Sequence, residues 1–215
     1  MEEGYTTVRG PGDSELIDRK SRFLGCCAHV TTEQEALGVL EEQKRRHRTA
    51  NHHVYAYRLR SGGLMRYSDD GEPQGTAGLP VLGVLTSGDI TDTVLVVTRY
   101  FGGTLLGTGG LVRAYGGTAA AALHNAGVAV MVLCARYSIS IAYTDYERVN
   151  RYLSESGAAL ESVEYTDTVT LIVRVTQAMS AVLESDIVEI TRGSSRAEFL
   201  STEYAETGGR GGRQP

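Results

Sequence analysis

Five glycines separate an apolar run from an alanine-rich segment in the middle of this chain. The apolar run, residues 93–98, has the composition of a buried strand. The alanine-rich segment, residues 114–125, is typical of a closely packed helix. This strand-to-helix unit predicts an α/β protein. Its connection exposes backbone that side chains do not shield, at Gly102, Gly103, Gly107, Gly109 and Gly110.

A loop of this kind can present bare N–H groups and a helix N-terminus to an anion. Arg99 and Arg113 stand at its two ends and add positive charge. The loop and both arginines therefore form a candidate site for an anion or an RNA backbone. A purely structural turn is the other interpretation, and the sequence leaves both open.

Known phosphate motifs do not fit the glycine loop. Gly102 and Gly107 have the spacing of a P-loop, but Thr108 and Gly109 follow where that motif needs lysine and then serine or threonine. The dinucleotide pattern fails as well, because Val112 stands in place of its last glycine. No nucleophile signature is present either, so we expect no cofactor and assign no catalytic residue.

Composition limits the classes of partner. The chain has 215 residues and a formal net charge of −5, which argues against a general polyanion binder and against DNA specificity. Its three cysteines form no C-x-x-C pair, which favours a cytoplasmic protein with reduced thiols. The most apolar stretch, 119–135, is interrupted by polar residues and glycine, so no membrane span is expected.

The first half alternates strands and helices. Strands are expected at 14–18, 22–30 and 53–59, and Thr32 begins a helix with Glu35 as its capping-box partner. The basic residues that end this helix suit its dipole or, alternatively, a phosphate-facing patch. They are Lys44, Arg45, Arg46 and Arg48.

The second half has a different order of elements, β-α-β-β-α-β, which is that of a ferredoxin-like domain. The elements are expected at 137–141, 144–156, 160–165, 169–175, 177–185 and 197–203. A strand at 129–134 ends the first half. We therefore divide the chain into domains at 1–135 and 136–206, followed by a disordered Gly/Arg tail at 207–215. The segment 192–196 is either a second anion-binding turn or a helix C-cap at Gly193.

Three carboxylates, Asp69, Asp70 and Glu72, lie within a segment too rich in Gly, Asp and Pro to be regular. Asp70 suits a turn, while Asp69 and Glu72 are open to a role in a site or to pairing with Arg99 or Arg113. Thr76 is expected to cap the helix that follows.

A metal- or nucleotide-dependent hydrolase or phosphotransferase that uses these carboxylates with His53 is the alternative hypothesis for function. His52 and His53 are adjacent on a strand and point to opposite faces, so at most one of them joins a given site. No histidine spacing indicates a metal site, and none is assigned.

Four blocks of the sequence, in this order and spacing, resemble the IMPACT-like family and its bacterial YigZ group. They are Lys20-Ser21-Arg22-Phe23, the segment 50–56, the segment 68–78 and the glycine loop from Arg99 to Tyr115. The resemblance covers nearly the whole chain. It implies a two-domain protein linked to translation control, without an established enzymatic activity. Lys20 and Arg22 join the candidate site on this basis.

The resemblance also carries expectations about fold and partners. It implies a first domain with the β-α fold shared by a small-subunit ribosomal protein and domain IV of elongation factor G. The second domain is similar to that factor's ferredoxin-like domain V. Eukaryotic relatives bind a large protein that activates a translation-control kinase. The function expected is a non-enzymatic regulator of translation or the stress response that contacts the ribosome, RNA or a protein through its glycine loop.

Overall fold

The computed structural model describes residues 4–206, and the tail predicted at 207–215 lies outside them. The chain is a mixed α/β protein with two sheets. It forms two compact units, Tyr5–Ala129 and, within the described residues, Gly4 with the chain from Val130 onward. Each unit is described by itself.

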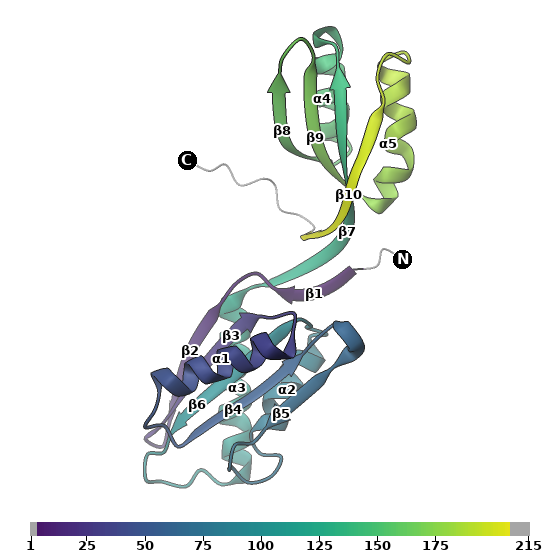
Figure 1. Ribbon diagram of the computed structural model, residues 1–215. Helices are drawn as coiled ribbons and strands as arrows, with labels where there is room; N and C mark the ends of the chain where they lie inside the picture. Colours follow the sequence, from purple (N-terminus) through teal and green to yellow (C-terminus); the bar gives the residue numbers. More distant parts are fainter. Residues whose placement is uncertain (1–3, 207–215) are drawn as a thin grey trace. The chain divides into compact units, whose positions relative to one another are not determined.

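The sheet of the first unit has the strand order β2-β3-β6-β4-β5 (Figure 1). All four pairs of neighbouring strands are antiparallel. The strands are β2 (Gly12–Asp18), β3 (Ser21–His29), β4 (His52–Arg58), β5 (Met65–Ser68) and β6 (Thr93–Tyr100). A short strand, β1 (Gly4–Val8), precedes them, and Thr6 bridges to Ile90.

Helices cover both faces of this sheet. Figure 1 shows α1 (Glu33–Arg46) on one side and α2 (Gly78–Ser87) with α3 (Thr108–Ala126) on the other. The central strand β6 is buried on both faces: Val94 and Val96 pack in the cluster beneath α1, and Leu95 and Val97 in the cluster beneath α2 and α3. This explains why residues 94–97 form an unbroken apolar run between two threonines.

The start of α1 agrees with its sequence pattern. The Thr32 side chain accepts a hydrogen bond from the Glu35 N–H, and the Glu35 carboxylate accepts one from the Thr32 N–H. The expectation for α2 is wrong. Thr76 does not cap this helix, because its hydroxyl donates to the Pro73 carbonyl at 2.6 Å. The carboxylate of Asp69, far back in the sequence, accepts from Ala77 and Gly78 instead.

The second unit contains the expected β-α-β-β-α-β order. Its elements are β7 (Val128–Ile141), α4 (Tyr146–Glu155), β8 (Ala159–Tyr165), β9 (Val169–Thr176), α5 (Gln177–Ile190) and β10 (Ala197–Glu206). The strand order is β10-β7-β9-β8, and every one of these pairs is antiparallel. Figure 1 shows α4 and α5 packed on one face of this sheet.

One strand replaces two that the sequence suggested between the domains. The segments 129–134 and 137–141 both belong to one continuous strand, β7. This strand pairs with β10 from Ile139 back to Met131, and the ladder of hydrogen bonds therefore spans both segments. The two compact units divide between Ala129 and Val130, near the start of this strand, whereas the expected boundary was at residue 135.

Candidate functional site

A cavity of about 380 Å³ opens beside the glycine loop in the first unit. Its accessible lining surface is mostly apolar, which is typical of sites that bind small molecules. The lining residues come from the start of β4, the turn after β5, the end of β6 and the loop into α3. They are Asn51, His52, Glu72, Pro73, Arg99, Phe101, Leu105, Leu106, Gly107, Thr108 and Leu111.

A buried ion pair lies in the wall of this cavity. Arg99 donates to the Glu72 carboxylate at 2.5 Å, and both side chains are about 95% buried. The same carboxylate oxygen accepts the Tyr115 hydroxyl at 2.7 Å, and Arg99 also donates to the Ser21 hydroxyl at 3.3 Å. Burial, reinforced by the hydrogen bond to Glu72, raises the pKa of Tyr115. The pairing of an acidic residue with Arg99, one of the alternatives open in the sequence, is therefore present.

The Nε–H of Arg99 is buried and has no hydrogen-bond partner among the described residues. Aromatic rings lie near the guanidinium, with the ring centres of Phe23 and Phe101 at 5.3 and 5.4 Å from its carbon. They offer no conventional acceptor. A buried donor without an acceptor is unfavourable by about 1–3 kcal/mol, which makes this atom unusual in a native structure.

The glycines of the loop have separate structural roles. A side chain on Gly102 would collide with the backbone of Lys20, whose carbonyl carbon would lie 2.1 Å from the added Cβ. Gly103 and Gly107 have φ angles of +80° and +72°. A Cβ on Gly110 would approach Leu106 to 2.9 Å, whereas at Gly109 it would meet only the tip of Arg113 at 3.5 Å. Backbone conformation or close packing thus explains why glycine occupies four of these five positions, whereas neither explains the glycine at position 109.

The N-terminus of α3 is open toward the solvent side of the loop. Its N-cap residue, Gly107, has no side chain to accept a hydrogen bond. The first N–H of this helix with an acceptor is that of Leu111, which donates to the Gly107 carbonyl. The preceding N–H groups, of Thr108, Gly109 and Gly110, have no partner among residues 4–206. Such groups and the helix dipole favour an anion.

The cations predicted around the loop do not all contribute to one exposed positive surface. Arg113 is exposed on α3 and has no ion-pair partner in the described part of the chain, and Lys20 is exposed beside Gly102. Arg99, by contrast, is buried. Arg22 is paired with Glu15 at 2.7 Å. The basic end of α1 is partly neutralised within its own helix, where Lys44 pairs with Glu41 and both Arg45 and Arg46 pair with Glu42. Arg48, just beyond the helix, is exposed.

The structure also places at the loop one cation that the sequence analysis did not identify. Arg19, at a φ of +44°, donates to the carbonyl of Leu105 at 3.3 Å. It thereby brings a third exposed basic side chain to the loop, with Lys20 and Arg113.

The three clustered carboxylates have three different partners. Asp69 accepts hydrogen bonds from the N–H groups of Gly75, Ala77 and Gly78, at 2.8 to 3.0 Å. Partial burial acts to raise its pKa, but these three bonds outweigh that effect and the pKa is lowered. Asp70 accepts from the N–H of His53 at 2.6 Å, as suits a turn residue. Glu72 alone lines the cavity.

The histidine that joins the cavity is His52, whereas the sequence had suggested His53. The Nδ1 of His52 lies 2.8 Å from the Asp70 carbonyl, and its Nε2 lies 3.8 Å from Glu72. His53 is buried, with Nδ1 3.1 Å from the Thr98 hydroxyl, and burial lowers its pKa. Across residues 4–206, no group of three or more His, Cys, Asp and Glu side chains has an arrangement suited to a metal ion.

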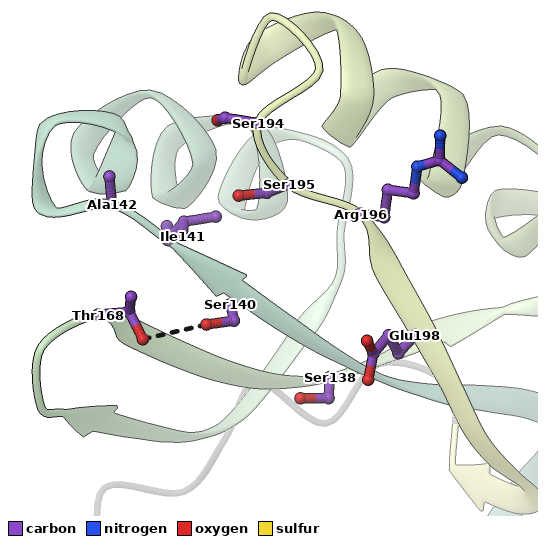
Figure 2. Close-up of a pocket in the computed structure, with 9 residues that line it drawn as sticks. All are labelled: Ser138, Ser140, Ile141, Ala142, Thr168, Ser194, Ser195, Arg196 and Glu198. Atoms are coloured by element: carbon purple, nitrogen blue, oxygen red, sulfur yellow. Dashed lines mark hydrogen bonds between the residues drawn. The ribbon is translucent and has the colours of Figure 1, made fainter.

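A second cavity, of about 480 Å³, lies in the second unit (Figure 2). Hydroxyl groups dominate its lining. Ser140 and Thr168 are hydrogen-bonded at 3.1 Å, and Figure 2 shows Glu198 beside Ser138 while Arg196 points away.

In the turn above this cavity, the N–H groups of residues 192–195 all have partners within the described part of the chain. Gly193 N–H donates to Val188, Ser194 N–H to Thr191, and Ser195 N–H to the Thr191 hydroxyl. Arg192 N–H donates to Glu189. The helix C-cap is therefore the interpretation that the geometry supports for this segment.

The comparisons with known proteins agree with the resemblance in the sequence. Residues 19–123 match the Impact N-terminal domain, and residues 139–194 match a domain of unknown function, DUF1949. The chain is 37% identical to IMPACT family member YvyE of Bacillus subtilis over 96% of this chain and 95% of that protein. This protein belongs to the IMPACT family.

Another curated relative and two solved structures are also similar to this chain. IMPACT family member YigZ of Escherichia coli is 32% identical over 82% of this chain and 88% of its own length. The crystal structure of a hypothetical protein is 30% identical and matches with a TM-score of 0.59, over 94% of this chain and 98% of that one. A solved structure of the two-domain translational regulator Yih1 is 31% identical over 55% of this chain and 48% of that one, with a TM-score of 0.37.

Within the described residues, no helix combines the length and the apolar composition that crossing a membrane requires.

Proposed function

We propose that this protein regulates translation as a non-enzymatic binding protein, and that it contacts ribosomal RNA through its glycine-loop face. That face consists of the loop, the N-terminus of α3, and the side chains of Arg19, Lys20, Phe101 and Arg113. Membership of the IMPACT family and the sequence similarity to a translational regulator support the general role.

The family resemblance implies that both domains are similar to parts of elongation factor G, and this expectation supports the ribosome as partner. The element order of the second unit and its strand order β10-β7-β9-β8 are consistent with a ferredoxin-like domain such as domain V of that factor. A shared fold alone is a weak argument for function. Two adjacent domains that both have the folds expected from one ribosome-binding factor would make a stronger one.

The chemistry of the glycine-loop face is the reason for proposing RNA as the ligand. Unpaired N–H groups at the start of α3 lie near Arg113, because a Cβ added at Gly109 would meet the Arg113 guanidinium at 3.5 Å. A phosphate there would accept hydrogen bonds from both. Phe101 is 44% exposed and can stack on an unpaired base. Since the chain as a whole is acidic, binding must come from this local surface.

The carboxylate cluster does not favour the alternative of a metal-dependent enzyme. Asp69 caps α2, Asp70 holds the β4 backbone, and Glu72 is paired with Arg99. Each carboxylate thus has a structural partner of its own. We therefore do not propose catalysis by this cluster.

Co-sedimentation with ribosomes across a series of salt concentrations tests the proposal. Because three exposed cations of residues 4–206 border the loop, we expect the logarithm of the binding constant to fall with the logarithm of salt at a slope of about two to three. Absence of sedimentation at every salt concentration would contradict ribosome binding. Binding that does not depend on salt would instead indicate an apolar contact with a ribosomal protein and would contradict the RNA contact.

A further inference from the structure

The cavity beside the glycine loop has more apolar lining than an RNA phosphate requires. Leu105, Leu106 and Leu111 meet Phe101 and Pro73 around it. The side chain of Leu105 is 80% exposed and that of Phe101 44% exposed, although both are large and apolar. Apolar groups that remain exposed around a cavity gain free energy when an apolar ligand covers them.

Two groups at the cavity require a hydrogen-bond acceptor. One is Arg99, a residue of the cavity lining, whose buried Nε–H has no partner among the described residues. The other is the N-terminus of α3, where Gly107 and Thr108 also line the cavity and no side chain caps the helix. A guanidinium and a helix N-terminus both prefer an acceptor with negative charge.

The remaining charges limit that acceptor to a single anionic group. Glu72 also lines the cavity, but its charge is compensated by Arg99 and by the hydroxyl of Tyr115. A second negative charge is unfavourable, because Arg99, the one arginine or lysine among the described residues that line the cavity, already compensates Glu72. A cationic head group would face Arg99 and the positive end of the helix dipole.

We propose that this cavity binds a monocarboxylate with an apolar body. The carboxylate accepts hydrogen bonds from Arg99 and from the N-terminus of α3, while the apolar body lies among Leu105, Leu106 and Leu111. A free organic acid and the C-terminal residue of a polypeptide share this chemistry. The proposal goes beyond the ribosome contact and does not depend on it.

Titration of the full-length protein with three matched probes tests the head group. The probes are 3-phenylpropanoate, its neutral amide, and 3-phenylpropylamine, and the measurements are isothermal titration calorimetry and thermal melting. We expect the acid to bind saturably and to raise the melting temperature. The amide should bind at least about tenfold more weakly, because it lacks the charge-assisted hydrogen bonds, and the amine should not bind. Equal binding of acid and amide, or no binding of the acid, overturns the proposal.

Two variants on α3 test the location. Thr108 lines the cavity mouth, whereas Val112 is 41% exposed on the same helix and does not line it. Thr108→Trp should abolish binding of the acid, and Val112→Trp should leave it unchanged. Unchanged binding by a folded Thr108→Trp protein overturns the assignment of the site.

A further titration, with peptides, distinguishes a free organic acid from the C-terminus of a polypeptide as the source of the carboxylate. A pentapeptide that ends in leucine is compared with the same peptide amidated at its C-terminus. Tighter binding of the free peptide than of 3-phenylpropanoate identifies a polypeptide end, and binding of the small acid alone identifies a free organic acid. These titrations contain no ribosomes, so their failure leaves the ribosome contact standing, and the reverse also holds.

Discussion

Arg99 and Glu72 form an ion pair at 2.5 Å that is almost wholly removed from solvent, with 5% and 4% of their side chains exposed. The pair joins the end of β6 to the turn after β5. It also fixes the wall of the cavity, because Tyr115 of α3 donates to the same carboxylate oxygen. Arg99 is therefore a structural cation within the site and is not part of its exposed positive surface.

Replacement of one member of this pair should be more harmful than replacement of both. Glu72→Gln leaves a buried guanidinium without its counter-charge, and we expect the free energy of unfolding to fall by about 3 kcal/mol. The double variant Glu72→Gln with Arg99→Met removes both charges and should be more stable than Glu72→Gln alone. Urea unfolding of the three proteins measures this. A double variant that is less stable than the single one would contradict a compensated pair.

Two glycines of the loop should respond differently to alanine. A Cβ at Gly102 would lie 2.1 Å from the Lys20 backbone, so Gly102→Ala should destabilise the protein or displace the loop. Gly109→Ala is the matched control, because it meets only a flexible side chain and removes a glycine from a helix. We expect it to be neutral or stabilising by up to about 1 kcal/mol. Equal melting temperatures for the two variants would contradict this difference.

Asp69 should stabilise the fold in a pH-dependent manner. Asp69→Ala removes three hydrogen bonds to backbone N–H groups, and we expect a loss of roughly 2 kcal/mol at neutral pH. Because its pKa is lowered in the folded state, the contribution is fully present above the unfolded pKa of about 3.9. It is lost as the pH falls through the folded value.

The control for this measurement is Asp167→Ala, at an exposed position in the turn before β9. It should change the free energy of unfolding by less than about 0.5 kcal/mol. The difference in stability between wild type and Asp69→Ala, followed by urea unfolding, should shrink as the pH falls below 4. A difference that is constant with pH would show that Asp69 does not act as a charged cap.

The second unit should fold as a separate fragment when its first strand is complete. β10 pairs with β7 from Ile139 back to Met131, so a fragment of residues 130–206 keeps the whole ladder. A fragment of residues 136–206, which begins at the boundary expected from the sequence, loses the partners of residues 202–206. We expect cooperative thermal melting of the longer fragment at a higher temperature. Non-cooperative melting of the longer fragment would contradict a separate domain.

Local patterns in the sequence predicted much of the fold. The capping box of Thr32 and Glu35 depends on residues three positions apart, and it forms as expected. The β-α-β-β-α-β order of the second half was predicted correctly from apolar periodicity. In contrast, the cap of α2 comes from Asp69, eight and nine positions before the residues it binds. Local capping preferences favoured Thr76, because they consider only residues next to the start of the helix and not partners eight or nine positions away.

The candidate site depends still more on long-range contacts. Alternation along β4 predicted that His52 and His53 point to opposite faces, but not which of them meets the cavity. That choice depends on Glu72 and the Asp70 carbonyl, which approach His52 from the turn after β5. The apolar lining was missed because Phe101 and Leu105 stand among glycines, where no periodicity marks a face. The signal in the sequence that could have indicated this lining was the presence of two large apolar residues in a glycine-rich loop.

The salt dependence of ribosome binding by an Arg113→Ala variant tests the central claim most directly. Arg113 is exposed on α3, and alanine preserves the helix. Arg196→Ala, which removes an exposed arginine from the second unit, is the matched control. We predict that Arg113→Ala weakens co-sedimentation and lowers the salt slope by about one unit, while Arg196→Ala changes neither. An Arg113→Ala protein that is folded and binds ribosomes with the wild-type affinity and slope would contradict an RNA contact at the glycine loop.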